Sequence, residues 1–247
     1  MGNRYRNGFT IIEVMLFLAV SGALAVGVLA TSSIAINQQR YRDALNTMQS
    51  SMQQQFNQTA NVVNDRTSDS HCDDSGIVST TNNNAVAQPR GTSECLVMGR
   101  TIEFAGDGQA MNFRTVVGYR SSEASDDVNS DIVALRQYKL FVSDTNAVST
   151  SVSWGAKVRL KQTTGTEPFY FVLLRSPVTG SLRTFFSKGS ISNNEISADL
   201  IDTSNMSEQT FCLESGGFTV ASTLGVVIRA NAASSNAIEL LGDKQAC

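Results

Sequence analysis

Residues 7–13 of the chain read Asn-Gly-Phe-Thr-Ile-Ile-Glu, and this stretch joins a short basic leader to a long apolar run. The leader carries Arg4 and Arg6, whereas Glu13 is the only ionisable side chain in residues 9–36. As a helix, the run would extend about 42 Å, more than the hydrocarbon core of a bilayer. An uncompensated carboxylate buried in the apolar surroundings of such a helix costs up to ~2.5–3.5 kcal/mol. Glu13 therefore requires an oppositely charged partner.

The junction resembles the class III signal of type IV pilins and pseudopilins: a basic leader ending in Gly, then Phe-Thr, two aliphatic residues, Glu and an apolar helix. In that family a membrane prepilin peptidase cuts after the Gly and methylates the new N-terminal Phe. The resemblance implies cleavage between Gly8 and Phe9, removal of residues 1–8 and N-methylation of Phe9. It also implies that Glu13 faces the Phe9 amine of a neighbouring subunit.

That pairing has a physical rationale. A carboxylate and an ammonium in an apolar helix bundle attract strongly, and they offset each other's desolvation only when they are docked. Misregistered subunits would leave one charge bare. The pair between Glu13 and the Phe9 amine is thus predicted to set the axial register of assembly.

Two positions depart from the family pattern. Asn7 stands where Lys or Arg is common, and Ala30 stands where major pilins often carry a kinking proline. Because no proline precedes Pro89, the N-terminal helix should be straighter than in those proteins. This favours a minor pilin or a pseudopilin over the bulk filament subunit.

Two other interpretations of the apolar run remain open. Residues 28–30 followed by Thr31 also fit an ordinary signal-peptidase site, which would release a secreted β-rich adhesin or binding protein. A plain uncleaved membrane anchor satisfies the hydropathy as well. Against the first, the basic region is short and Glu13 interrupts the apolar start.

The helix is predicted to continue beyond the membrane. Residues 37–64 contain no Pro or Gly, and their apolar side chains recur at helical spacing. We expect one helix over about 9–64, membrane-embedded in 9–36 and amphipathic in 37–64. The apolar stripe, whose amphipathic part should dock on the head, consists of Ile34, Tyr41, Leu45, Met48, Met52, Phe56, Thr59 or Ala60, and Val63.

Residues 65–247 should form one β-rich head, large enough for a proper core. Successive strand-like runs without intervening helical patterns indicate antiparallel pairing. The predicted fold class is α+β: a pilin-like lollipop whose long helix packs on an antiparallel sheet domain. The expected strands are 96–104, 113–120, 132–142, 152–162, 169–174, 182–186, 218–220 and 226–229.

The four cysteines all lie beyond the membrane segment, and an even count on the exported side indicates two disulfides. Three connectivities are open. Sequence proximity favours Cys72 with Cys95 and Cys212 with Cys247, and many pilins have a comparable C-terminal disulfide-bounded loop.

A formal net charge of -3 argues against a general nucleic-acid binder. Lys157, Arg159 and Lys161 alternate with Val158 and Leu160, which places three cations on one strand face. That face is a candidate contact for DNA phosphates, although a solvated sheet face is the favoured interpretation.

No catalytic constellation, metal site or cofactor is predicted. His71 is the sole histidine, and the segment 71–74 (His-Cys-Asp-Asp) is better explained as a structural loop. Residues 106–108 (Gly-Asp-Gly) form a turn without the Lys-Ser/Thr of a phosphate cradle. An acidic loop could hold Ca²⁺ but lacks a recognised spacing, so a solvated turn is favoured: Glu123, Asp126, Asp127, Asn129 and Asp131.

The sequence thus predicts a non-enzymatic subunit of a type IV pilus-like filament, with a minor pilin first and a type II secretion pseudopilin as the alternative. The resemblance implies other pilins, a prepilin peptidase, and an assembly ATPase with its membrane platform as partners. The subunit would span the inner membrane once, in contact with lipid, with its head outside, and would then join an extracellular filament.

Overall fold

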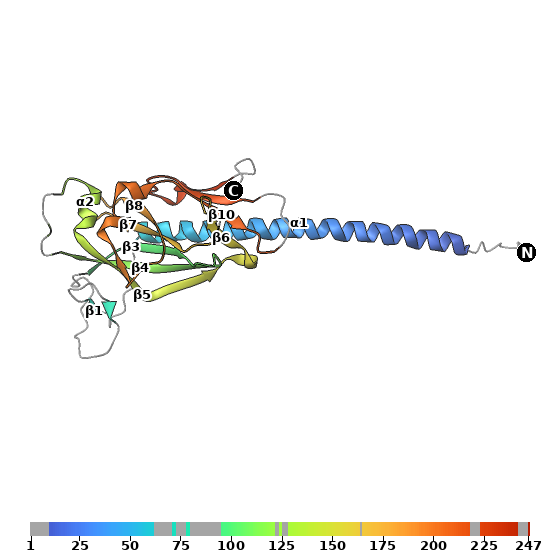
Figure 1. Ribbon diagram of the computed structural model, residues 1–247, viewed down its shortest axis with the longest axis horizontal. Helices are drawn as coiled ribbons and strands as arrows, with labels where there is room; N and C mark the ends of the chain where they lie inside the picture. Colours follow the sequence, from blue (N-terminus) through green and yellow to red (C-terminus); the bar gives the residue numbers. More distant parts are fainter. Residues whose placement is uncertain are drawn as a thin grey trace, which may run out of the picture.

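A long helix, α1 (Ile11–Ala60), forms the spine of the molecule and projects its N-terminal half away from a β-rich head (Figure 1). The structure is a computed structural model, and it describes residues 10–61, 71–72, 78–79, 95–121, 124, 128–163, 165–217, 223–241 and 247. The predicted α+β lollipop is confirmed. α1 runs without a sharp kink, as expected for a helix that lacks proline. It ends at Ala60, a little before the expected boundary, and Asn61 has left the helical conformation.

Within the described residues, the head contains two larger antiparallel sheets, whereas one sheet was expected. The six-stranded sheet has the order β8-β7-β3-β4-β5-β9, and the four-stranded sheet has the order β12-β11-β10-β6. A two-stranded pair joins β1 (His71–Cys72) to β2 (Val78–Ser79). The strands of the six-stranded sheet are β3 (Cys95–Phe104), β4 (Ala110–Arg120), β5 (Tyr138–Ser151), β7 (Phe169–Arg175), β8 (Leu182–Lys188) and β9 (Glu195–Ile196). Those of the four-stranded sheet are β6 (Lys157–Leu160), β10 (Gln209–Glu214), β11 (Gly225–Ile228) and β12 (Ile238–Leu241).

Both faces of the six-stranded sheet are buried, and each face has its own hydrophobic core. Along β7, Phe169, Phe171 and Leu173 face the core that holds α1, while Val172 and Leu174 face the other. The second core is covered by α2 (Asp131–Arg136) and by the short helices η2 (Ala198–Leu200) and η3 (Thr203–Met206). Because β7 packs on both sides, its sequence is a continuous apolar run and does not alternate.

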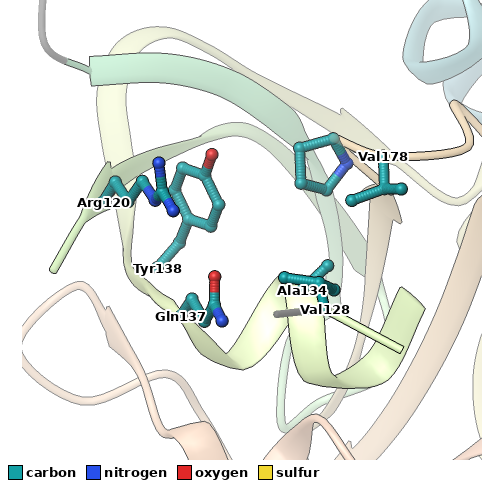
Figure 2. A pocket seen from close by; sticks show the side chains of 7 residues that line it. Arg120, Val128, Ala134, Gln137, Tyr138 and Val178 are labelled. Carbon is teal, nitrogen blue, oxygen red and sulfur yellow. The ribbon is translucent and has the colours of Figure 1, made fainter. Parts of the chain in front are cut away.

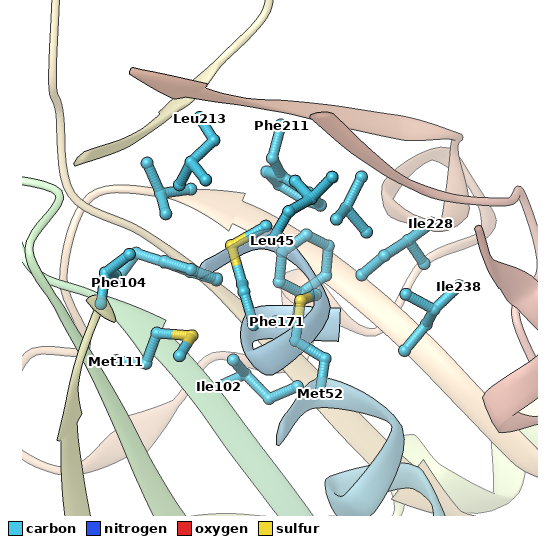
Figure 3. Close-up of a cluster of buried hydrophobic side chains, with 14 of the residues drawn as sticks. Leu45, Met52, Ile102, Phe104, Met111, Phe171, Phe211, Leu213, Ile228 and Ile238 are labelled. Carbon is cyan, nitrogen blue, oxygen red and sulfur yellow. The ribbon is translucent and has the colours of Figure 1, made fainter. Parts of the chain in front are cut away.

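The first core joins α1 to both sheets (Figure 3). Rings of the two sheets stack there, since the centroid of Phe169 on β7 lies 5.4 Å from that of Phe211 on β10. The predicted helical stripe is confirmed from Tyr41 to Thr59, where its members are buried at 2% exposure or less; Ile34 is 56% exposed instead, and Val63 lies outside the described residues. The buried members are Tyr41, Leu45, Met48, Met52, Phe56 and Thr59.

Several expected strands need correction. Residues 132–142 are not one strand: α2 occupies the first part, and β5 begins only at Tyr138. The helix forms because Ser130 caps it, with its hydroxyl accepting from the Val133 N–H at 3.3 Å. Residues 152–162 divide into a 3₁₀ turn, η1 (Ser153–Gly155), and β6. The strands β9, β10 and β12 were not predicted, and the expected run 218–220 lies outside the described residues.

Candidate assembly site

The N-terminus of α1 is capped by Thr10. The Thr10 hydroxyl accepts a hydrogen bond from the Glu13 N–H at 3.3 Å, while the backbone of Thr10 is extended. The spacing Thr-x-x-Glu is that of a capping box, so the sequence carries a signal for this helix start that was not predicted. The cap places Glu13 in the first turn, where the helix dipole favours a negative charge. The predicted cleavage site, Gly8 and Phe9, lies outside the described residues.

The N-terminal half of α1 is an exposed apolar rod. Ile11 is 78% exposed and Leu29 is 70% exposed, and similar values continue to Ile36 at 49%. None of its most apolar window is buried in the subunit, and by length and composition the helix could cross a membrane. So much exposed apolar surface on one element requires a cover of lipid or of other helices.

The rod meets the head at Tyr41, the first fully buried residue of the stripe. Its hydroxyl accepts from the Leu224 N–H at 2.8 Å and donates to the carbonyl of Leu213. Burial raises the pKa of Tyr41 above its ordinary value, against the lowering effect of the Leu224 hydrogen bond, so the hydroxyl stays protonated at neutral pH. One side chain thus ties α1 to the loop between β10 and β11 and to β10 itself.

Replacing Tyr41 with Phe should lower the free energy of unfolding by about 1–3 kcal/mol, because the buried Leu224 N–H loses its acceptor. Denaturant unfolding of the full chain in detergent measures this. Tyr170→Phe is the matched control, since Tyr170 is half-buried and its hydroxyl makes no hydrogen bond within the described part of the chain. Equal losses from the two variants would contradict the assigned role of Tyr41.

The C-terminus is fastened to the same place. Cys212 on β10 forms a disulfide with Cys247, and the Thr223 hydroxyl donates to the Cys247 carbonyl at 3.2 Å. Cys95 is also disulfide-bonded, while the side chain of Cys72, its predicted partner, lies outside the described residues. Cys247 is therefore bonded to β10, the same strand to which Tyr41 donates its hydrogen bond.

The basic strand face is β6. Val158 and Leu160 are buried, and the opposite face carries Lys157 and Arg159; Lys161, predicted on the same face, lies in the turn after the strand. Arg159 Nε donates to Glu214 Oε1 at 2.7 Å, and its Nη1 donates to the Thr163 carbonyl. This ion pair offsets part of the positive charge on the face, and the nucleic-acid contact stays a prediction.

Asp131, from the candidate acidic loop, points into the head. It accepts hydrogen bonds from the hydroxyls of Ser176, Thr179 and Ser181 at 2.7–2.8 Å, and it pairs with Arg183 at 2.7 Å. These donors, the Ser176 hydroxyl first and Arg183 next, hold the pKa of Asp131 well below its usual range. They fasten the loop between β7 and β8 to the start of α2.

The same carboxylate is therefore fully occupied by protein donors. Glu123, Asp126 and Asp127 lie outside the described residues, and Asn129 is exposed. Over the part of the chain that the structure describes, no three His, Cys, Asp or Glu side chains gather as a metal site would require. The sequence did not predict this role of Asp131, because its partners lie 45 or more positions away and no local pattern indicates them.

A cleft of about 310 Å³ lies beside α2, at the end of the head far from the N-terminus (Figures 1 and 2). Figure 2 shows Arg120, Gln137 and Tyr138 on one side of it and Val178 on the other. None of its described lining residues is a carboxylate, a histidine or a cysteine, the groups that most often supply a nucleophile or an acid–base pair.

Residues 3–29 match the family model described as the prokaryotic N-terminal methylation motif. No curated protein and no solved structure matched the chain. The match covers the basic leader, the capped first turn with Glu13 and most of the exposed apolar rod. It supports a type IV pilin-like or pseudopilin-like subunit, which is a structural role and not that of an enzyme family. The chain therefore carries the N-terminal signal of type IV pilin-like prepilins.

Proposed function

We propose that this chain is a structural subunit of a type IV pilus-like filament, and specifically a minor pilin, matured by cleavage after Gly8. The observation that carries the proposal is the coincidence of the methylation motif with a capped, wholly exposed apolar helix half. Burial of that half among the same helices of neighbouring subunits supplies affinity. Glu13, paired with the Phe9 amine of a neighbour, supplies the register.

The partners of this function are other pilins, a prepilin peptidase, and an assembly ATPase with its membrane platform. Before assembly, the subunit is anchored in the inner membrane with its head outside. A type II secretion pseudopilin shares the same N-terminal architecture, and the straight, proline-free α1 suits either role.

The N-terminal peptide of the native protein tests the proposal. We expect mass spectrometry to find a chain that begins at Phe9 and is one methyl group heavier than the unmodified peptide. A chain that begins at Thr31 would instead indicate ordinary signal-peptidase release and would remove the filament function. An intact N-terminus at Met1 would indicate a plain anchor and would contradict it equally.

A further inference from the structure

The stretch of α1 without an ionisable side chain is bounded by Glu13 and Arg40. At 1.5 Å per residue these two charges lie about 40 Å apart along the helix. A bilayer with its headgroup layers is about 40–45 Å thick. With Glu13 among the inner headgroups, Arg40 would thus stand among the outer ones.

The head begins at this same level, because Tyr41 is 2% exposed while Arg40 is exposed. The head segment in contact with Arg40 is the turn η1. There, the Arg40 guanidinium carbon lies 4.9 Å from the ring centroid of Trp154. A cation and an aromatic ring therefore stack at the neck of the molecule.

Trp154 is not a core residue. It is 50% exposed, and it holds a left-handed backbone conformation with φ 62°. Such a conformation costs a bulky residue of order 1–3 kcal/mol and is found mainly where function requires it. The turn presents a large indole to the surroundings at a backbone cost that core packing does not explain.

We propose that, in the membrane-bound subunit, Trp154 and Arg40 lie in the outer headgroup layer and set the height of the head above the bilayer. This proposal rests on the proposed function, in which the subunit is anchored in the membrane before it is assembled. Tryptophan partitions to the membrane–water interface, where its ring is sheltered and its N–H stays hydrated. The edge of the stacked Arg40 guanidinium keeps N–H donors for lipid phosphates, and exposed Arg42 adds a second cation.

The chain supplies its own probe, because Trp154 is its only tryptophan. The full chain is reconstituted in phosphatidylethanolamine–phosphatidylglycerol vesicles containing a lipid spin-labelled at the headgroup. The matched control combines Trp154→Phe with Val178→Trp, which moves the probe to an exposed position in the cleft beside α2, and α2 lies at the end of the head far from the N-terminus (Figure 1). We expect headgroup quenching of Trp154 to exceed that of the control by about threefold, with weaker quenching by aqueous iodide.

Arg40→Gln should reduce the headgroup quenching of Trp154 while leaving the protein bound to the vesicles. Headgroup quenching no greater than in the Val178→Trp control would overturn the proposal. Shielding of Trp154 from both the lipid label and iodide in these vesicles would show that protein covers the indole, and it would overturn the proposal too. Vesicle flotation confirms that the chain is membrane-bound in this test, whereas failure of the proposed function is recognised separately, by a native N-terminus at Thr31 or Met1 and not at Phe9.

Discussion

A subunit carrying Glu13→Ala is expected to enter filaments at least about tenfold less efficiently than the unaltered subunit. The Phe9 amine of the neighbour would then be left in an apolar bundle without its counter-charge. A bare charge there costs ~2.5–3.5 kcal/mol, and 1.4 kcal/mol already corresponds to a factor of ten. Quantitative immunoblotting of sheared filaments, with both forms of the subunit co-expressed, measures the ratio.

Three further variants sharpen this result. Glu13→Gln keeps the shape of the side chain without its charge, and its incorporation into filaments should fall as far as that of Glu13→Ala. Glu13→Asp keeps the charge and should retain part of the incorporation. Thr31→Ala alters another exposed polar side chain of the same helix and should incorporate normally. The unfolding of the head should not change in any of them, because Glu13 belongs to neither core. If the Glu13→Ala variant were incorporated normally, the pair between Glu13 and the Phe9 amine would not set the register of the subunits.

The second large effect is expected at Asp131. Its replacement with Ala should lower the free energy of unfolding by about 2–4 kcal/mol, because three hydroxyls and Arg183 lose a nearly buried common acceptor. Denaturant unfolding followed by circular dichroism measures the loss. Asp107→Ala is the control, since that exposed carboxylate accepts only from the Gln109 N–H within the described residues and should cost less than about 1 kcal/mol.

The same carboxylate should make stability depend on acid. The pKa of Asp131 is lower in the folded chain than its ordinary value, so the folded state binds this proton less tightly than the unfolded state does. Its stabilising contribution is complete well above the unfolded pKa of about 3.9 and is lost as pH falls toward the folded pKa. The difference in the free energy of unfolding between the unaltered chain and the Asp131→Ala variant should therefore become smaller below about pH 4. A difference that stays constant far below that pH would contradict the assignment.

The sequence predicted correctly those elements of the fold that a local residue pattern specifies. The stripe from Tyr41 to Thr59 follows from 3.6-residue periodicity, and the exposed rod follows from a long apolar run in which Glu13 is the only ionisable residue. The strands β3, β4 and β7 were predicted because each contains several β-branched or aromatic residues. These features need no knowledge of distant parts of the chain.

What it predicted poorly depends on distant partners. β10 and β12 are short, and they are strands because each pairs with β11, which periodicity cannot reveal. Ile132 and Val133 suggested a strand, but the Ser130 cap and the Asp131 contacts to the loop after β7 hold them in a helix. The turn that brings Trp154 onto Arg40 likewise joins residues far apart in sequence.

Because α1 packs against both sheets, its burial determines when the core of the head can be completed during synthesis. The helix is synthesised first, yet Gln49 Nε2 donates to the carbonyl of Ile238 on β12, the last strand of the chain, at 3.0 Å. Contacts of such high sequence separation form late, because the loop between them must close before they contribute. The core therefore cannot be sealed from the first part of the polypeptide alone. A chain that stops before β12 could pack its helical stripe on β3 and β7 but would leave the part beside β12 uncovered, so the core closes fully only after the C-terminal strand has been synthesised.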